Sequence, residues 1–261
     1  MRAKQGFTHK DFAHVLNKYK YHLSLGDIVA GTIFSEEEEG FLVDIGAKIA
    51  AYLPKEETSL NRNPFSNSNI INETREFFIL AYNKKRQQLI ISIRRLDYIR
   101  GWKRIKQMQA EDILINLSIY NINKGGLLTQ IEGIQGFIPN SHLVNAHNKK
   151  PLLNKQLKCQ FLIADEKSNK LIFSNKRAML TMFSQSIQVG QIIYGTITQI
   201  KTYGLFININ KITALLHISE IGDKYINSIE NIFTVGNQIK VKIIHIDKKR
   251  GRLSVSRRNL N

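Results

Sequence analysis

The chain has 261 residues, one cysteine and a formal net charge of +17 at pH 7. One cysteine cannot form an internal disulfide, and no apolar run approaches the roughly 18 residues that a membrane-spanning helix needs. The composition therefore excludes a disulfide-stapled protein and a helical membrane protein, and we expect a reducing, aqueous compartment. An excess of positive charge is typical of proteins that bind a polyanion.

The first predicted element is a helix within an N-terminal extension, residues 1–23. Its apolar residues recur at positions i, i+3, i+4 and i+7, the spacing of one helical face. They are Phe12, Val15, Leu16 and Tyr19.

A repeat organises the rest of the chain. Three apolar strands end on a serine followed by basic residues, and these serines, Ser92, Ser174 and Ser256, are 82 residues apart. A fixed period indicates an array of one folding unit. Each unit contains five short β-rich runs in roughly 70 residues, which is too little sheet for a sandwich and favours a small closed barrel. We predict barrels over residues 24–94, 110–175 and 188–258.

The segments between the units, residues 95–109 and 176–187, change to a helical period. In the first of them apolar residues recur every three positions, which predicts an amphipathic helix. Trp102 lies on this apolar stripe, so we interpret it as a packing residue rather than a base-stacking one. In the second segment a weaker helical pattern runs from residue 176 to about 183.

Strand alternation in the third unit separates core residues from outward ones. Leu205 and Ile207 fall on the core side of their strand, so Phe206 points outward. Tyr203 lies on the wrong face by strict alternation, but a bulge at Gly204 would return its ring to the side of Phe206.

The same alternation predicts further outward side chains on the next three strands. They are His217, Lys240, Lys242 and Arg252. Aromatic rings that stack on unpaired bases, beside cations that follow the phosphates, suit single-stranded RNA. Each residue also has a plainer reading. Phe206 could pack under a loop, His217 could make a structural hydrogen bond, and any single lysine could serve only to solvate the surface.

The first two units lack this combination. Phe206 is matched by Leu42 and Leu128, and His217 is matched by Pro54 and Pro139. The first unit also carries the acidic run 36–39, which would repel phosphate, whereas the third unit and the first linker hold most of the positive excess. Outward leucines and an acidic run favour a protein partner for these two units.

Four motifs of the third unit resemble the S1 RNA-binding domain, an OB-fold barrel. They read Tyr203-Gly-Leu-Phe206-Ile, Leu215-Leu-His217-Ile-Ser219-Glu220, Ile246-Asp247 and Gly251-Arg252-Leu-Ser254. The resemblance implies an all-β fold of three tandem five-stranded OB-fold barrels joined by short α-helical linkers. It also implies an RNA face made of Tyr203, Phe206, His217, Asp247 and Arg252.

Four further segments, residues 6–12, 26–31, 44–48 and 74–78, extend the likeness beyond the third unit. With them the whole chain resembles the three-domain ribosomal protein S1 family of cyanobacteria and plastids. This resemblance implies an mRNA-binding protein of the small ribosomal subunit that supports translation initiation, with the first two modules docked on ribosomal proteins and the third holding mRNA. The implied location is the plastid stroma, with a bacterial cytoplasm as the alternative.

No enzyme is expected, and neither is a cofactor, a metal site, a small-molecule substrate or a membrane partner. The seven histidines are scattered without metal-ligand spacing. Two other possibilities stay open: an accessory module of a ribonuclease, and a free RNA chaperone or RNA-binding regulator.

Overall fold

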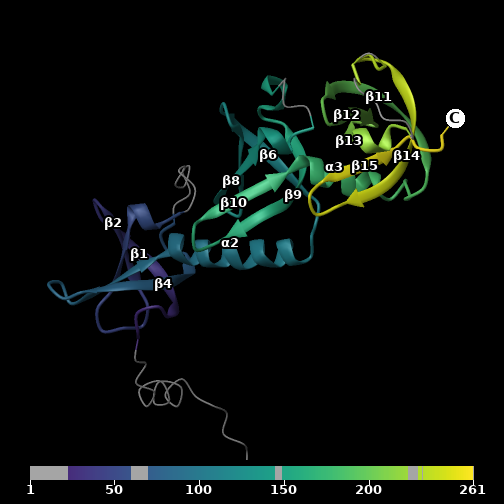
Figure 1. Cartoon of the computed structure of the whole chain (residues 1–261). Coiled ribbons are helices and arrows are strands. Elements are labelled where there is room, and N and C mark those ends of the chain that lie inside the picture. Colours follow the sequence, from purple (N-terminus) through teal and green to yellow (C-terminus); the bar gives the residue numbers. More distant parts are fainter. Residues whose placement is uncertain (1–22, 60–69, 145–148, 223–228, 231, 261) are drawn as a thin grey trace, which may run out of the picture. The chain divides into compact units, whose positions relative to one another are not determined.

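The computed structural model describes residues 23–59, 70–144, 149–222, 229–230 and 232–260. The helix predicted in the N-terminal extension falls within residues 1–22 and so lies outside the described residues. The chain forms two compact units, residues 1–99 and 100–261. The first unit contains one β-barrel and the second contains two (Figure 1).

Each barrel is built from five strands in the same spatial order. The first barrel comprises β1 (Ile28–Glu36), β2 (Gly40–Asp44), β3 (Ala51–Pro54), β4 (Thr74–Asn83) and β5 (Gln88–Ser92). The second comprises β6 (Ile115–Ile122), β7 (Gly126–Ile131), β8 (Ile134–Pro139), β9 (Gln156–Asp165) and β10 (Lys170–Ser174). The third comprises β11 (Ile192–Lys201), β12 (Gly204–Ile209), β13 (Ile212–His217), β14 (Gln238–Asp247) and β15 (Arg252–Ser256).

All three barrels are closed, and the third strand of each pairs in parallel with the fifth while the other pairings are antiparallel. This closure leaves no unpaired sheet edge, which is how a small all-β domain avoids edge-to-edge association. The predicted fold of three tandem five-stranded barrels is confirmed.

The barrel interiors are filled by the side chains that strand alternation predicts. In the third barrel Leu205, Ile207, Val241 and Val255 are fully buried. Each such side chain contributes about 1.5–3 kcal/mol by leaving water. Cys159 on β9 is also fully buried, as its place in a predicted strand requires.

Two α-helices follow the first and second barrels, α2 (Ile93–Ala110) and α3 (Asn175–Phe183). Trp102 of α2 is 1% exposed, which confirms its role in packing. Within the described residues no helix is long and apolar enough to span a membrane. Short 3-10 turns follow the third strand of each barrel: η1 (Lys55–Glu57), η2 (Asn140–His142) and η4 (Ile218–Glu220), with a further turn, η3 (Lys150–Leu152), before β9.

The repeated serine has a structural role that explains its fixed spacing. Ser92 Oγ accepts a hydrogen bond from Arg95 N at 2.7 Å, and Ser174 Oγ accepts one from Arg177 N at 3.1 Å. In the third copy Ser256 Oγ accepts from Arg258 N at 3.1 Å. A serine that ends a strand thus caps the backbone that follows, so the repeat marks the end of each barrel.

Candidate nucleic-acid interface

Phe206 lies in the middle of β12 and points away from the barrel interior. Its neighbours Leu205 and Ile207 are fully buried, whereas Phe206 is half-buried and pairs across the strands with Leu215 of β13. The predicted outward orientation of Phe206 is confirmed. A half-buried ring on the outside of a small barrel has packing support on one side and an accessible surface on the other.

Tyr203 lies beside Phe206 as predicted, but the bulge at Gly204 that the sequence predicted is wrong. There is no bulge at Gly204, which pairs regularly with Lys201 and His217. Tyr203 instead occupies the second position of the two-residue turn that joins β11 to β12. From this turn its 48% exposed ring reaches Phe206 edge to face, with ring centroids 6.2 Å apart and planes at 89°.

Gly204 makes this arrangement possible because no other residue fits there. A Cβ at Gly204 would lie 2.3 Å from the carbonyl oxygen of Leu216, and its φ of +156° is rarely adopted by L side chains. The glycine lets β12 and β13 approach closely at the base of the turn. It thereby places the turn that carries Tyr203 against the strand that carries Phe206.

His217 ends β13 and organises the 3-10 turn η4. Its Nδ1 lies 2.8 Å from Ser219 Oγ and accepts a hydrogen bond from Ser219 N at 3.3 Å. Pro54 and Pro139 hold the same place before η1 and η2, with φ near −60° as at His217. His217, Pro54 and Pro139 therefore share a backbone conformation at equivalent positions of the three barrels. Because Nδ1 of His217 is engaged with Ser219, Nε2 is the ring nitrogen that can contact a ligand.

Asp247 and Arg252 are cross-strand neighbours at the end of the β14–β15 hairpin. Asp247 Oδ1 accepts a hydrogen bond from Arg250 N at 2.9 Å, so this carboxylate shapes the turn. Arg252 is exposed. The hairpin thus presents two arginines on a turn that the aspartate holds in shape.

Lys240 and Lys242 lie on β14 opposite Tyr194 and Ile192 of β11. Both face outward, as alternation predicts, because Val241 between them is fully buried. Neither borders the cleft described next, so the structure does not bring these two lysines to the aromatic pair.

A cleft of about 800 Å³ opens beside the aromatic pair. The third barrel contributes Tyr203, Phe206, Thr213, Leu215, Arg250, Gly251, Arg252, Leu253 and Ser254, and the second barrel with α3 contributes Ser141, His142, Leu162 and Lys176. Three of these side chains are cationic and none is a carboxylate. Arg250 Nε lies 4.0 Å from Asp247 Oδ2, outside the lining, whereas Lys176 and Arg252 form no ion pair among the described residues. The cleft therefore combines an exposed ring and a half-buried ring with a net positive charge, the pairing that single-stranded nucleic acid requires.

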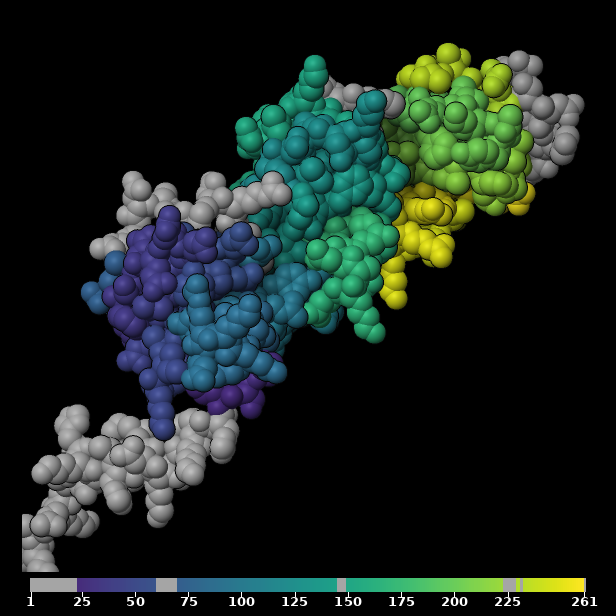
Figure 2. Space-filling view, turned by 90° about the vertical axis from the view of Figure 1, so that its left-hand side faces the viewer, coloured from purple at the N-terminus to yellow at the C-terminus, as the bar shows by residue number. Residues whose placement is uncertain are grey.

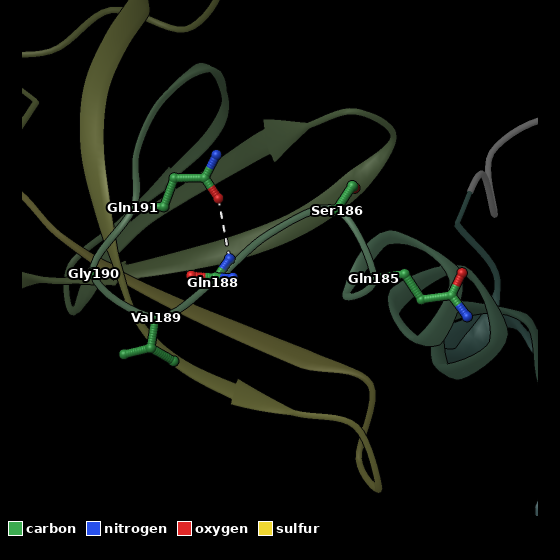
Figure 3. Close-up of a pocket in the computed structure, with 6 residues that line it drawn as sticks. All are labelled: Gln185, Ser186, Gln188, Val189, Gly190 and Gln191. Atoms are coloured by element: carbon green, nitrogen blue, oxygen red, sulfur yellow. Dashed lines mark hydrogen bonds between the residues drawn. The ribbon is translucent and has the colours of Figure 1, made fainter.

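A second hollow, between α3 and β11, has a different character. It is lined by residues 185, 186 and 188–191, and within it Gln188 N donates to Gln191 Oε1 at 3.0 Å (Figure 3). None of its lining side chains carries a charge. This hollow offers amide and backbone hydrogen bonds but nothing to neutralise a phosphate, so the cleft at Phe206 is the stronger candidate.

The first two barrels each carry an outward aromatic residue that does not appear when only the strands equivalent to β12 are compared. Opposite Leu42 on β2 lies Tyr52 on β3, and opposite Leu128 on β7 lies Phe137 on β8. The third barrel has the reverse pair, Phe206 opposite Leu215. The ring and the leucine have exchanged strands, which becomes visible only when the strands are paired.

Those two rings are placed differently from Phe206. A Cβ on Gly40 would come within 2.6 Å of the Tyr52 ring, and one on Gly126 within 2.8 Å of the Phe137 ring. Each ring therefore covers the backbone at the start of the adjacent strand. Burial and the carboxylates of Glu39 and Glu37 raise the pKa of Tyr52, while the smaller effects of Arg86 and Lys55 oppose them, so acidic side chains have the larger influence at this ring.

Sequence reasoning also missed the wall of the cleft that the second barrel supplies. His142 and Lys176 belong to an earlier repeat unit than Phe206, so no pattern within one unit connects them. The sequence did mark Lys176 as one of the basic residues that follow each repeated serine, but it gave no indication that Lys176 lines a cleft. Its position beside the third barrel depends on how α3 packs.

Within the part of the chain that the structure describes, no group of three or more histidine, cysteine, aspartate or glutamate side chains could hold a metal ion. Cys159 is buried in the core, and burial raises the pKa of its thiol to about 12. A thiol in that state is a poor nucleophile at neutral pH.

Comparison with known proteins identifies the third barrel and the family of the whole chain. Residues 186–258 match the S1 RNA binding domain model. Over 261 residues the chain is 54% identical to small ribosomal subunit protein bS1c of Pyropia yezoensis and 53% identical to that of Porphyra purpurea, covering 99% of each chain in both cases. It is 46% identical to protein bS1A of Synechocystis over 99% of this chain and 79% of that protein. The chain therefore belongs to the bacterial-type ribosomal protein S1 family, a family of non-enzymatic small-subunit proteins with RNA-binding S1 barrels.

Proposed function

We propose that the third barrel holds single-stranded mRNA on the small ribosomal subunit during translation initiation, while the first two barrels attach the protein to the subunit. The observation that carries this proposal is the edge-to-face pair of Tyr203 and Phe206 beside a cleft lined by three cations, of which only Arg250 has a carboxylate partner among the described residues. Stacking accepts every base, so we expect broad sequence tolerance.

An anchoring role for the first two barrels is supported by their surfaces. The rings of Tyr52 and Phe137 cover the backbone of the adjacent strand at Gly40 and Gly126, and the charges of Glu39 and Glu37 act on Tyr52. Negative charge at an aromatic ring disfavours RNA and suits a basic protein. The names of the relatives, which place them in the small ribosomal subunit, support ribosomal proteins as the partners.

The plastid stroma is the proposed location, with a bacterial cytoplasm as the alternative. Support comes from the similarity to the plastid and cyanobacterial members of the family.

A triple variant tests the division of labour. Replacing Tyr203, Phe206 and His217 with alanine should weaken binding to a fluorescent single-stranded RNA, because each lost stacking contact costs about 1–3 kcal/mol. Sedimentation of the same variant with small ribosomal subunits should be unchanged. Unchanged RNA affinity would refute the role of the third barrel, and loss of sedimentation in mRNA-free subunits would refute the anchoring role of the first two.

A free RNA-binding regulator is the second candidate, since the interface alone does not require a ribosome. Sedimentation separates the two functions. Wild-type protein that stays in the supernatant when mRNA-free small subunits are pelleted would favour the regulator.

A further inference from the structure

Two barrels of the second unit form the cleft beside Phe206. The RNA face that the sequence resemblance implies, in contrast, lies on the third barrel alone. One wall is the β14–β15 hairpin of the third barrel, with Arg252 and with Arg250, whose exposed side chain lies 4.0 Å from Asp247 Oδ2. The other wall is formed by His142 of η2 and Lys176 in the first turn of α3. A strand that leaves the aromatic pair in this direction passes between positively charged side chains of both barrels.

Close packing brings the two walls together. Gly251, at the tip of the hairpin, has a φ of +65°, and a Cβ there would lie 3.0 Å from the backbone nitrogen of Arg177 and 3.1 Å from its Cα. The hairpin therefore rests on the first turn of α3 with no room for a side chain. In Figure 2 the yellow C-terminal part of the third barrel lies against the green part of the chain that precedes that barrel.

The remainder of α3 is also attached to the third barrel. Leu180 is fully buried in the hydrophobic core of that barrel, and Met179 and Phe183 pack against it. Lys176 and the two arginines thus project from elements that are packed on one another. Cations held in this way lose less freedom when they bind an anion than cations on a loose linker.

Lys176 is half-buried and has no acidic partner among the described residues. Its Nζ donates to the carbonyl oxygen of Ser141 at 2.8 Å, and burial lowers its pKa. Partial burial of an ammonium group without a counter-charge is unfavourable, and an anion in the cleft would offset that cost.

The His142 side chain lies within reach of positive charges from both walls of the cleft. His142 Nδ1 lies 3.0 Å from Ser174 Oγ, which anchors the ring on the second barrel. Burial lowers the pKa of His142, and Lys176 and Arg252 lower it further, so charges from the two barrels both reach this ring.

We propose that the cleft holds a backbone phosphate of the RNA strand that stacks on the third barrel, with Lys176, Arg250 and Arg252 as its cationic contacts. The second barrel and α3 then form part of the RNA path, which extends beyond the single-barrel S1 face. This inference rests on the proposed function of the third barrel.

Salt dependence tests the inference, because each phosphate contact to a single strand adds about 0.7 to the slope of log affinity against log salt. The full-length protein is titrated with fluorescein-labelled 12-nucleotide oligouridylate across a tenfold range of KCl. The test variant is Lys176→Gln. Lys176→Arg is the conservative rescue, and Lys170→Gln at the opposite end of β10 is the matched control for charge loss.

Lys176→Gln should bind more weakly at low salt, and its affinity should fall about fivefold less than that of wild type over the tenfold rise in KCl. Lys176→Arg and Lys170→Gln should keep the wild-type slope. If Lys176→Gln keeps it too, while alanine at Tyr203 and Phe206 weakens binding, the cleft site is wrong and the function of the third barrel stands. If the aromatic variants bind like wild type, both proposals are overturned.

Discussion

Replacing Phe206 with leucine removes the proposed stacking surface while keeping the barrel intact. Leucine is the residue found at this place in the other two barrels, as Leu42 and Leu128, so the backbone accepts it. The side chain is half-buried and packs beside Leu215, and a substitution between apolar residues of similar size costs less than about 1.5 kcal/mol. The variant should therefore fold.

The expected loss of RNA affinity follows from the ring that is removed. A base stacked on an aromatic side chain contributes about 1–3 kcal/mol by alanine substitution. Leucine still offers an apolar contact, so the loss should fall in the lower part of that range, about 1–2 kcal/mol. This corresponds to an increase in Kd of about 5- to 30-fold.

Fluorescence anisotropy with labelled single-stranded RNA measures the change, and Phe137→Leu is the matched control. Phe137 carries the outward ring of the second barrel, but that ring lies over Gly126 and is not part of the proposed RNA face. Phe137→Leu should bind RNA like wild type. A Kd for Phe206→Leu within twofold of wild type, or equal losses in both variants, would refute the reasoning.

Three further predictions concern stability and reactivity. Gly204→Ala would place its Cβ 2.3 Å from the Leu216 carbonyl oxygen, so the free energy of unfolding should fall by about 1–3 kcal/mol, with a lower urea midpoint. The control Gly222→Ala has open space around the added methyl group and should unfold like wild type. Burial raises the pKa of Cys159 to about 12, so Ellman's reagent should label it only as the protein unfolds, and rapid labelling of native protein would contradict this burial. Burial and two neighbouring cations hold the pKa of His142 below its usual 6.5, so the unfolded chain takes up a proton first and stability should fall as pH drops below about 6.5. His142→Asn should show a smaller fall between pH 7 and pH 5, and identical urea midpoints across that range for both proteins would contradict the assignment.

The barrel cores could be predicted because they depend on local alternation. Leu205, Ile207 and Val241 follow the two-residue period of a strand, and that period alone separates the buried face from the exposed one. The repeated serine could be located for a similar reason, although its capping of Arg95, Arg177 and Arg258 emerged only from the structure.

Features that depend on pairing between strands could not be predicted from one strand at a time. The exchange of ring and leucine between Phe206 and Leu215, relative to Leu128 and Phe137, requires the register of two strands. The position of Tyr203 depended on where β11 ends. Alternation does not apply inside a two-residue turn, so the predicted bulge was wrong.

The cleft depends on contacts over a still longer range. Lys176 reaches the third barrel because α3 buries Leu180 in the core of that barrel and Gly251 allows the hairpin to rest on the helix. A periodic sequence suggests modules that act separately. The structure of the second unit instead places residues of two modules around one cleft.

Photocrosslinking tests the central claim, that the third barrel carries the RNA, most directly. The full-length protein is bound to 4-thiouridine-containing single-stranded RNA, irradiated and digested with trypsin, and the crosslinked peptides are identified by mass spectrometry. The account predicts that the main crosslinked peptide spans residues 202–211, which contain Tyr203 and Phe206. Crosslinks concentrated on the strands of the first barrel, with that peptide unmodified, would contradict it.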